Sequence, residues 1–318
     1  MTTQLAAQLA AIALIVAPVF ALIGLGYVAS RAGHLGERAA EGLSEYVFGL
    51  SVPVLIFKTL AEARLPEEGQ PWGYWAAYFI GAFAAFGLGM LAARRLFGRE
   101  HAEAVVQGFA SGQANTVFVG VPLILQAFGP DGAVPLFLLI AIHLPVMMVA
   151  ATVLAEGAQT GLSLPALRRL GRALASNPIL IGIYAGALAK LVGFAPTGLA
   201  KQTVDMLAAS AVPCALVSLG LALHRYPIRG DFGPACLISA LKLGVHPLIV
   251  FALVQVLPMP KVWADVAVAF AAMPCGINAY LLAQRYKTGV AAAASAVSLS
   301  TLLSLFTVAA WLMVLGVG

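Results

Sequence analysis

Apolar runs of about twenty residues recur along this chain, and they constrain its fold more than any other feature. Of its 318 residues, 61% are hydrophobic and 10% are charged, whereas an ordinary soluble domain has about 25% charged residues. A soluble core of this size cannot bury so much apolar surface, but a membrane-spanning helix needs about 20 mostly apolar residues. We therefore predict an all-α integral membrane protein. Its ten predicted spans cover residues 9–29, 43–61, 72–93, 104–128, 133–155, 177–194, 203–223, 232–257, 265–284 and 290–317.

Lysine and arginine concentrate in alternate loops between these spans. The loops after the odd-numbered spans hold twelve of the 18 basic residues, and the opposite side holds at most five. Because positively charged loops stay in the cytoplasm, we expect both termini to lie outside it. The net charge of +5 thus belongs to short loops and does not indicate nucleic-acid binding. No basic residue precedes the first apolar run, so we expect a retained helix rather than a cleaved signal peptide.

Similar proline-containing motifs occur in both halves of the chain. Pro53 in LSVPVLIF and Pro213 in SAVPCALVSLG both interrupt a span, the second and the seventh. The fourth and ninth spans carry SGQANTVFVGVPLI and AAMPCGINAYLLA, each with asparagine, glycine and proline. These matches predict two five-helix repeats, residues 1–160 and 161–318, and the odd helix number makes the repeat inverted. Inverted repeats with interrupted helices in corresponding positions are typical of secondary transporters.

The fourth and ninth spans are predicted to break within the membrane. Pro122 removes a backbone hydrogen bond and clashes with the preceding turn, near Phe118. If both breaks meet, two half-helix N-termini face one space, which favours an anion such as a carboxylate. The alternative is ordinary proline kinks with hydrogen bonds between helices. The candidate substrate-binding residues are Gln113, Asn115, Thr116, Gly120, Gly276, Asn278 and Tyr280.

Lys242 and His246 are ionisable residues within the eighth span, four residues apart and hence on one helix face. Such residues are candidates for function. Lys242 could supply positive potential near the site or pair with the counter-charge of a coupling ion. Alternatively, its long side chain could reach back to the membrane interface.

Acidic residues are scarce in the predicted spans. Asp205 and Asp265 are the nearest candidates, and both lie close to helix ends. A buried carboxylate that would bind a coupling proton or sodium ion is therefore not evident, and no metal or other cofactor is predicted. Sodium could still bind through backbone carbonyls and the amide and hydroxyl groups of Gln113, Asn115, Thr116 and Asn278. Gly182 and Gly186 form a GxxxG motif, which indicates either a dimer face or close internal packing.

The motifs ANTVFVGVPL, NPILIGIYAGALA, VPCALVSLGLAL, LKLGVHPL and MPCGINAYLLAQRY together resemble the auxin efflux carrier family, which includes bacterial malonate-type carriers. The resemblance covers essentially the whole chain. It implies a fold similar to bile-acid sodium symporters, with a scaffold from helices 1, 2, 6 and 7 and a transport domain from helices 3–5 and 8–10. It also implies elevator-type alternating access and a homodimer. By position, Asn115 and Asn278 match the family's crossover asparagines, and Pro122 and Pro274 its crossover prolines.

The sequence therefore predicts a secondary transporter in the cytoplasmic membrane for a small organic anion, such as a mono- or dicarboxylate. Pro53, Pro213, Lys242 and His246 are expected to support the site. One alternative is a sodium-coupled organic anion symporter, and another is a membrane sensor that binds the ligand without moving it. An intramembrane enzyme is not predicted, because the spans carry no catalytic motif such as HExxH. A passive channel fits the interrupted, repeated helices less well than a carrier.

Overall fold

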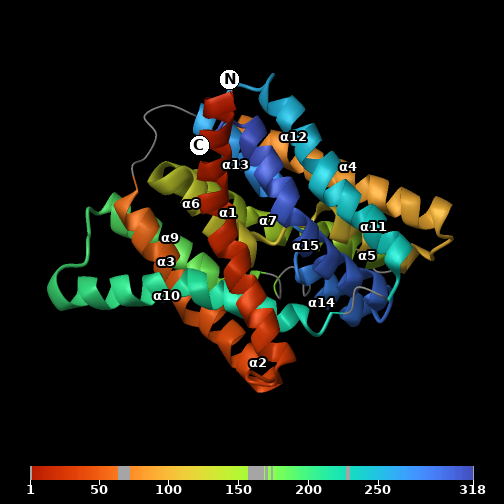
Figure 1. Ribbon diagram of the computed structural model, residues 1–318, viewed down its shortest axis with the longest axis horizontal. Coiled ribbons are helices and arrows are strands. Elements are labelled where there is room, and N and C mark those ends of the chain that lie inside the picture. Colours follow the sequence, from red (N-terminus) through yellow and green to blue (C-terminus); the bar gives the residue numbers. More distant parts are fainter. Residues whose placement is uncertain are drawn as a thin grey trace. The chain divides into compact units, whose positions relative to one another are not determined.

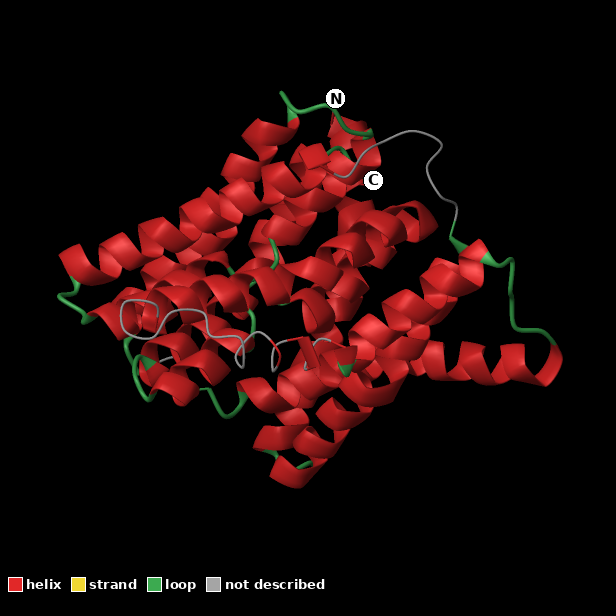
Figure 2. Ribbon diagram, turned by 180° about the vertical axis from the view of Figure 1, so that it is seen from behind, coloured by secondary structure: helices red, strands yellow, loops and turns green. Residues whose placement is uncertain are grey.

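The computed structural model describes residues 2–63, 72–156, 168, 171–172, 175–226 and 230–317, and these residues form helices joined by loops (Figures 1 and 2). The α-helices are α1 (Thr2–Arg31), α2 (Glu37–Tyr46), α3 (Val52–Glu62), α4 (Trp72–Leu96), α5 (His101–Gly112), α6 (Val121–Phe128), α7 (Ala133–Glu156), α9 (Pro178–Leu191), α10 (Gly198–Leu223), α11 (Phe232–Ala240), α12 (His246–Val254), α13 (Lys261–Ala271), α14 (Asn278–Tyr286) and α15 (Val290–Val314). Shorter helical segments are η1 (Val47–Ser51), η2 (Thr116–Gly120), η3 (Gly129–Gly132) and η4 (Leu241–Val245).

Seven helical stretches in the described part of the chain are long and apolar enough to cross a membrane. Several begin or end within a residue or two of the predicted spans; α4 begins at Trp72 and α7 at Ala133, as expected. The fourth and ninth predicted spans are each divided, into α5 with η2 and α6, and into α13 and α14. The sixth corresponds to the shorter apolar helix Pro178–Leu191. The all-helical membrane class is thus confirmed.

The chain divides into two compact units. The first comprises Met1–Ala21, Glu67–Ala127 and Arg225–Gly318, and the second comprises Leu22–Pro66 and Phe128–His224. The first unit therefore contains both broken spans, whereas α7 belongs to the second. The described residues do not include three of the loop arginines, Arg64, Arg169 and Arg229. They also do not include the expected boundary between the two repeats at residue 160.

In the second unit, glycines let helices approach closely. A Cβ atom at Gly182 would lie 2.5 Å from the Pro53 carbonyl oxygen, and one at Gly186 would lie 2.9 Å from that of Phe57. Both glycines of the GxxxG motif therefore pack α9 against α3 within one chain. The motif serves internal packing, the second of the two roles considered from the sequence.

Three five-residue π-helical segments each precede a proline at the second position of the next helix. The prolines are Pro53 after η1, Pro122 after η2 and Pro247 after η4. In each case the residue before the proline donates its N–H five residues back, as Val121 does to Thr116. The wider turn accommodates the proline ring, which otherwise clashes with the carbonyl four residues earlier.

Prolines also leave carbonyl oxygens without their usual helical donor, and in the first unit side chains from other helices supply it. Pro18 has no N–H to donate to the Leu14 carbonyl, which instead accepts from Gln126 Nε2 at 3.2 Å. Pro247 likewise has no N–H for the Leu243 carbonyl, which instead accepts from Trp311 Nε1 at 3.1 Å. Such partners are needed because lipid offers no hydrogen bonds to freed backbone groups.

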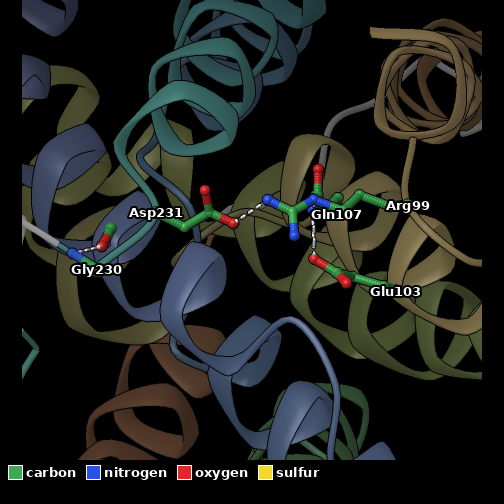
Figure 3. A network of polar contacts seen from close by, with 6 residues as sticks. Arg99, Glu103, Gln107, Gly230 and Asp231 are labelled. Atoms are coloured by element: carbon green, nitrogen blue, oxygen red, sulfur yellow. Dashed lines mark hydrogen bonds and ion pairs between the residues drawn. The ribbon is translucent and has the colours of Figure 1, made fainter. Parts of the chain in front are cut away.

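In the first unit, a polar network joins the loop before α5, the helix α5 and the residue before α11 (Figure 3). Arg99, between α4 and α5, donates to Asp231 Oδ2 at 2.6 Å, and its Nε lies 3.4 Å from Glu103. Gln107 also donates to Glu103, at 3.1 Å. The network thereby fixes the start of α5 against the residue preceding α11.

Candidate functional site

The two helix breaks meet in the first unit. Helix α5 ends at Gly112, and the chain of α13 leaves the helix after Ala271. Between these ends, Ala114 and Cys275 form an antiparallel bridge. The Asn115 N–H donates to the Pro274 carbonyl at 2.8 Å, and the Gly276 N–H donates to the Gln113 carbonyl at 3.2 Å. Two extended segments thus cross inside a helical unit and satisfy each other's backbone groups.

Side chains from two further helices complete the crossing. Ser300 of α15 accepts from the Cys275 N–H at 3.0 Å. Lys242 of η4 donates from its ammonium group to the Ala271 carbonyl at 2.5 Å, at the C-terminal end of α13. Both side chains are fully buried. Every one of these contacts compensates a backbone group that the broken helix no longer pairs.

Two buried amides lie directly in the crossing. Gln113 is only 1% exposed and Asn115 only 3% exposed. Gln113 Nε2 donates to the Ala114 carbonyl at 2.8 Å, which fixes the orientation of its amide. Gln113 Oε1 and Asn115 Nδ2 are both buried without a hydrogen-bond partner. An unpaired acceptor and an unpaired donor are each costly to bury alone, so both groups are available to a water molecule or a polar ligand.

The N-terminal ends of the half-helices carry the remaining candidates. Thr116 begins η2, and Asn278 begins α14; both are partly exposed. Gly120 is buried at the end of η2. Helix N-termini present N–H groups and partial positive charge, so this arrangement suits an anionic ligand.

Comparison with known proteins relates the chain to membrane transport proteins. A family model described as "Membrane transport protein" matches residues 11–166 and 163–312. The chain belongs to this family, that of the auxin efflux carriers. It is 31% identical over 301 residues to a Rhizobium meliloti protein described as "Putative malonate transporter", with 92% of each chain covered. It is 29% identical over 297 residues to an "Uncharacterized transporter" of Methanothermobacter thermautotrophicus, with 93% of this chain and 96% of that protein covered. The protein is accordingly a membrane transporter and not an enzyme.

The two candidate crossover prolines of the transporter occupy different positions. Pro274 lies in the crossing itself, where its carbonyl accepts from Asn115. Pro122 lies in the first turn of α6, beyond the π segment. The break therefore falls at residues 113–115 and not near Phe118, where the sequence placed it, because the π turn absorbs the clash of Pro122.

Tyr280 belongs to an aromatic pair beside the half-helix α14. Its ring centroid lies 4.5 Å from that of Tyr226, and Gln284 donates to its hydroxyl. Burial, with a smaller contribution from Tyr280, raises the pKa of Tyr226 to about 12 against the opposing effect of Arg225. The Tyr226 hydroxyl therefore stays protonated at physiological pH.

The supporting candidates divide between the units. Pro53 and Pro213 lie in the second unit, Pro53 after a π segment and Pro213 within α10. Lys242 and His246 lie in the first unit and are both fully buried; the ring of His246 lies 5.4 Å from that of Tyr78. Lys242 therefore points inward to the break and does not reach the membrane interface.

The acidic residues nearest the spans are already paired. Asp205 lies 2.6 Å from Lys58 and 2.7 Å from Lys201. Asp265 lies 2.8 Å from Lys261. Among the described residues, no cluster of three histidine, cysteine or acidic side chains could hold a metal ion.

Ser300 is the residue of the crossing that sequence reasoning missed. It belongs to a run of buried hydroxyl residues on α15, which comprises Ser295, Ser298, Ser300, Thr301 and Ser304. Small hydroxyl side chains in an apolar span mark close helix contacts with hydrogen bonds. This run was the available signal, although it does not identify which hydroxyl meets the break.

Proposed function

We propose that the transporter moves a small carboxylate, of the malonate class, across the cytoplasmic membrane by alternating access. The observation that carries this proposal is the crossing of two broken helices with the unpaired amide groups of Gln113 and Asn115 inside it. The description of the Rhizobium meliloti relative supports a malonate-like substrate. In the proposed site, the Asn115 and Asn278 amides donate to carboxylate oxygens at the positive ends of the half-helices.

The wider architecture is part of the same proposal. Ten spans form two inverted five-helix repeats, and both termini lie outside the cytoplasm. The crossing belongs to an elevator-type transport domain, and two copies associate through the scaffold. Paired breaks in the predicted fourth and ninth spans support the repeat, because they occupy corresponding places in the two halves.

Flux into proteoliposomes tests the function. The panel contains labelled malonate, other dicarboxylates and indole-3-acetate, each with and without sodium and a pH gradient. We expect saturable uptake of one carboxylate, and a fall of tenfold or more in Asn115→Ala and Asn278→Ala. Asn177→Ser is the matched control, since it removes an amide from the N-cap of α9 while keeping a capping oxygen.

Three outcomes would contradict the proposal. Normal flux in both asparagine variants would show that the substrate does not bind at the crossing. Binding of a carboxylate without flux would indicate a sensor. Absence of both binding and flux in folded, inserted protein would exclude the substrate class.

Sodium-coupled symport is the second candidate. Gln113 Oε1 favours it, because this buried acceptor lacks a donor and amide oxygens coordinate sodium. Flux that disappears when choline replaces sodium would establish this candidate.

A further inference from the structure

Helix α14, which begins at the candidate ligand Asn278, has a small buried face. It is nine residues long, and a helix of this length is not stable by itself. Its buried residues are Ala279, Leu282 and Ala283, and two of these three are alanines. The ring of Tyr280, two residues after Asn278, is therefore an important contact for the position of this helix.

The ring of Tyr280 packs against Tyr226, a residue far away in the sequence. The two ring centroids are 4.5 Å apart, and the rings are tilted by 57°. Gln284, one turn further along α14, donates to the Tyr280 hydroxyl and so holds the ring in this direction. Aromatic pairs at such distances stabilise a contact beyond the burial of their surface. Tyr226 thus supports α14 from outside the helix crossing.

Tyr226 is itself held by α15. Ser298 Oγ of that helix donates to the Tyr226 carbonyl at 2.8 Å. Four residues later in the chain, the Gly230 N–H donates to Ser295 Oγ at 3.2 Å. Ser295 and Ser298 are both buried. These two contacts fix the backbone that carries the Tyr226 ring, so the ring can hold Tyr280 in one place.

We propose that Tyr226 is a positioning residue for substrate binding, whose ring holds α14 so that Asn278 keeps its place at the crossing. The inference deepens the proposed function, because it rests on the carboxylate site and names what fixes one half of it. Tyr226 acts through Tyr280, which lies about 3 Å from Asn278 along the helix axis. Since a displacement of about 1 Å can cost about 100-fold in rate, a small shift of α14 is sufficient to weaken the site.

Flux kinetics of single variants test whether the ring is the group that matters. Tyr226→Ala removes the ring and should raise the KM for the transported carboxylate about fivefold or more, while the maximal flux changes less than about twofold. Tyr226→Phe keeps the ring and should restore the wild-type KM. Tyr27→Ala is the matched control, because it removes a ring from another aromatic pair, with His224, in the second unit. If Tyr226→Ala does not fold, Tyr226→Leu takes its place.

Double variants separate the positioning of Asn278 from a general loss of structure. In the Asn278→Ala background, Tyr226→Ala should change the KM by less than about twofold, because the group that it positions is gone. In the Asn115→Ala background it should still raise the KM about fivefold, because Asn115 lies on the other chain segment of the crossing. An equal rise in both backgrounds, or an unchanged KM in the single variant, would overturn the inference.

Hydrogen exchange in detergent measures the support of α14 without any substrate. Tyr226→Ala should speed the exchange of the amides of α14 and leave those of α13 unchanged. Unchanged exchange in α14 would also overturn the inference. If the wild type transports no carboxylate, the proposed function fails, while the exchange experiment still decides whether Tyr226 holds α14.

Discussion

Gly276 holds the crossing together because it has no side chain. A Cβ atom there would lie 2.0 Å from Gln113 Oε1 and 2.7 Å from the amide carbon and nitrogen. The backbone of Gly276 does not require glycine, since its φ is not positive. Gly276→Ala must therefore displace the buried Gln113 amide by about 1.4 Å to reach ordinary contact, which breaks its bond to the Ala114 carbonyl. Losing that bond costs about 1 kcal/mol, and the overpacking adds about 1–3 kcal/mol.

Gly120→Ala is the comparison, because a Cβ atom there would lie 3.4 Å from the Asn115 carbonyl oxygen and 3.6 Å from Met273. We expect this variant to stay within about 1 kcal/mol of wild type. Thermal unfolding of purified protein in detergent, together with carboxylate binding, measures both variants. Adding Gln113→Ala to Gly276→Ala should recover stability by removing the clash. Equal unfolding temperatures for Gly276→Ala and Gly120→Ala would refute the reasoning.

Three other substitutions test contacts of the described helices by the same unfolding measurement. Ser300→Ala removes the acceptor for a buried N–H in the break and should cost about 1–3 kcal/mol, and an unchanged unfolding temperature would contradict this. Trp311→Phe keeps an aromatic ring, though a smaller one, and leaves the Leu243 carbonyl without a donor, so a loss at least as large is expected. An unchanged stability would show that this carbonyl finds another partner. Gly182→Val places a side chain against the Pro53 carbonyl and should lower stability by about 1–3 kcal/mol or more, with Gly24→Val, at a position open to added atoms, as the control.

Span positions were predictable from the sequence because lipid requires long apolar helices and charged residues end them. Helix α4 begins at Trp72 and α10 ends at Leu223, as predicted. The presence of two broken spans was predictable as well, since proline, glycine and amides are unusual together in an apolar run. These signals are local, and a local window is sufficient to read them.

The details of the crossing depend on partners far apart in the sequence. Pro122 drew the predicted break toward Phe118, yet a π turn carries the helix past that proline. The actual break is set by the pairing of Ala114 with Cys275, which no local pattern reveals. Likewise, the burial of Lys242 depends on the α13 carbonyl it contacts, and the sequence alone left its direction open.

The π segments also have a consequence for comparing this transporter with its relatives. A π turn holds about one residue more than an α turn, so deleting one residue from Leu241–Val245 would restore an ordinary helix while the residues that follow keep their faces. His246 would then stay on the buried face, although the chain had lost a residue. Single-residue gaps in an alignment at these three segments therefore keep the inward helix faces, whereas a gap within a regular α-helix rotates all that follows by about 100°.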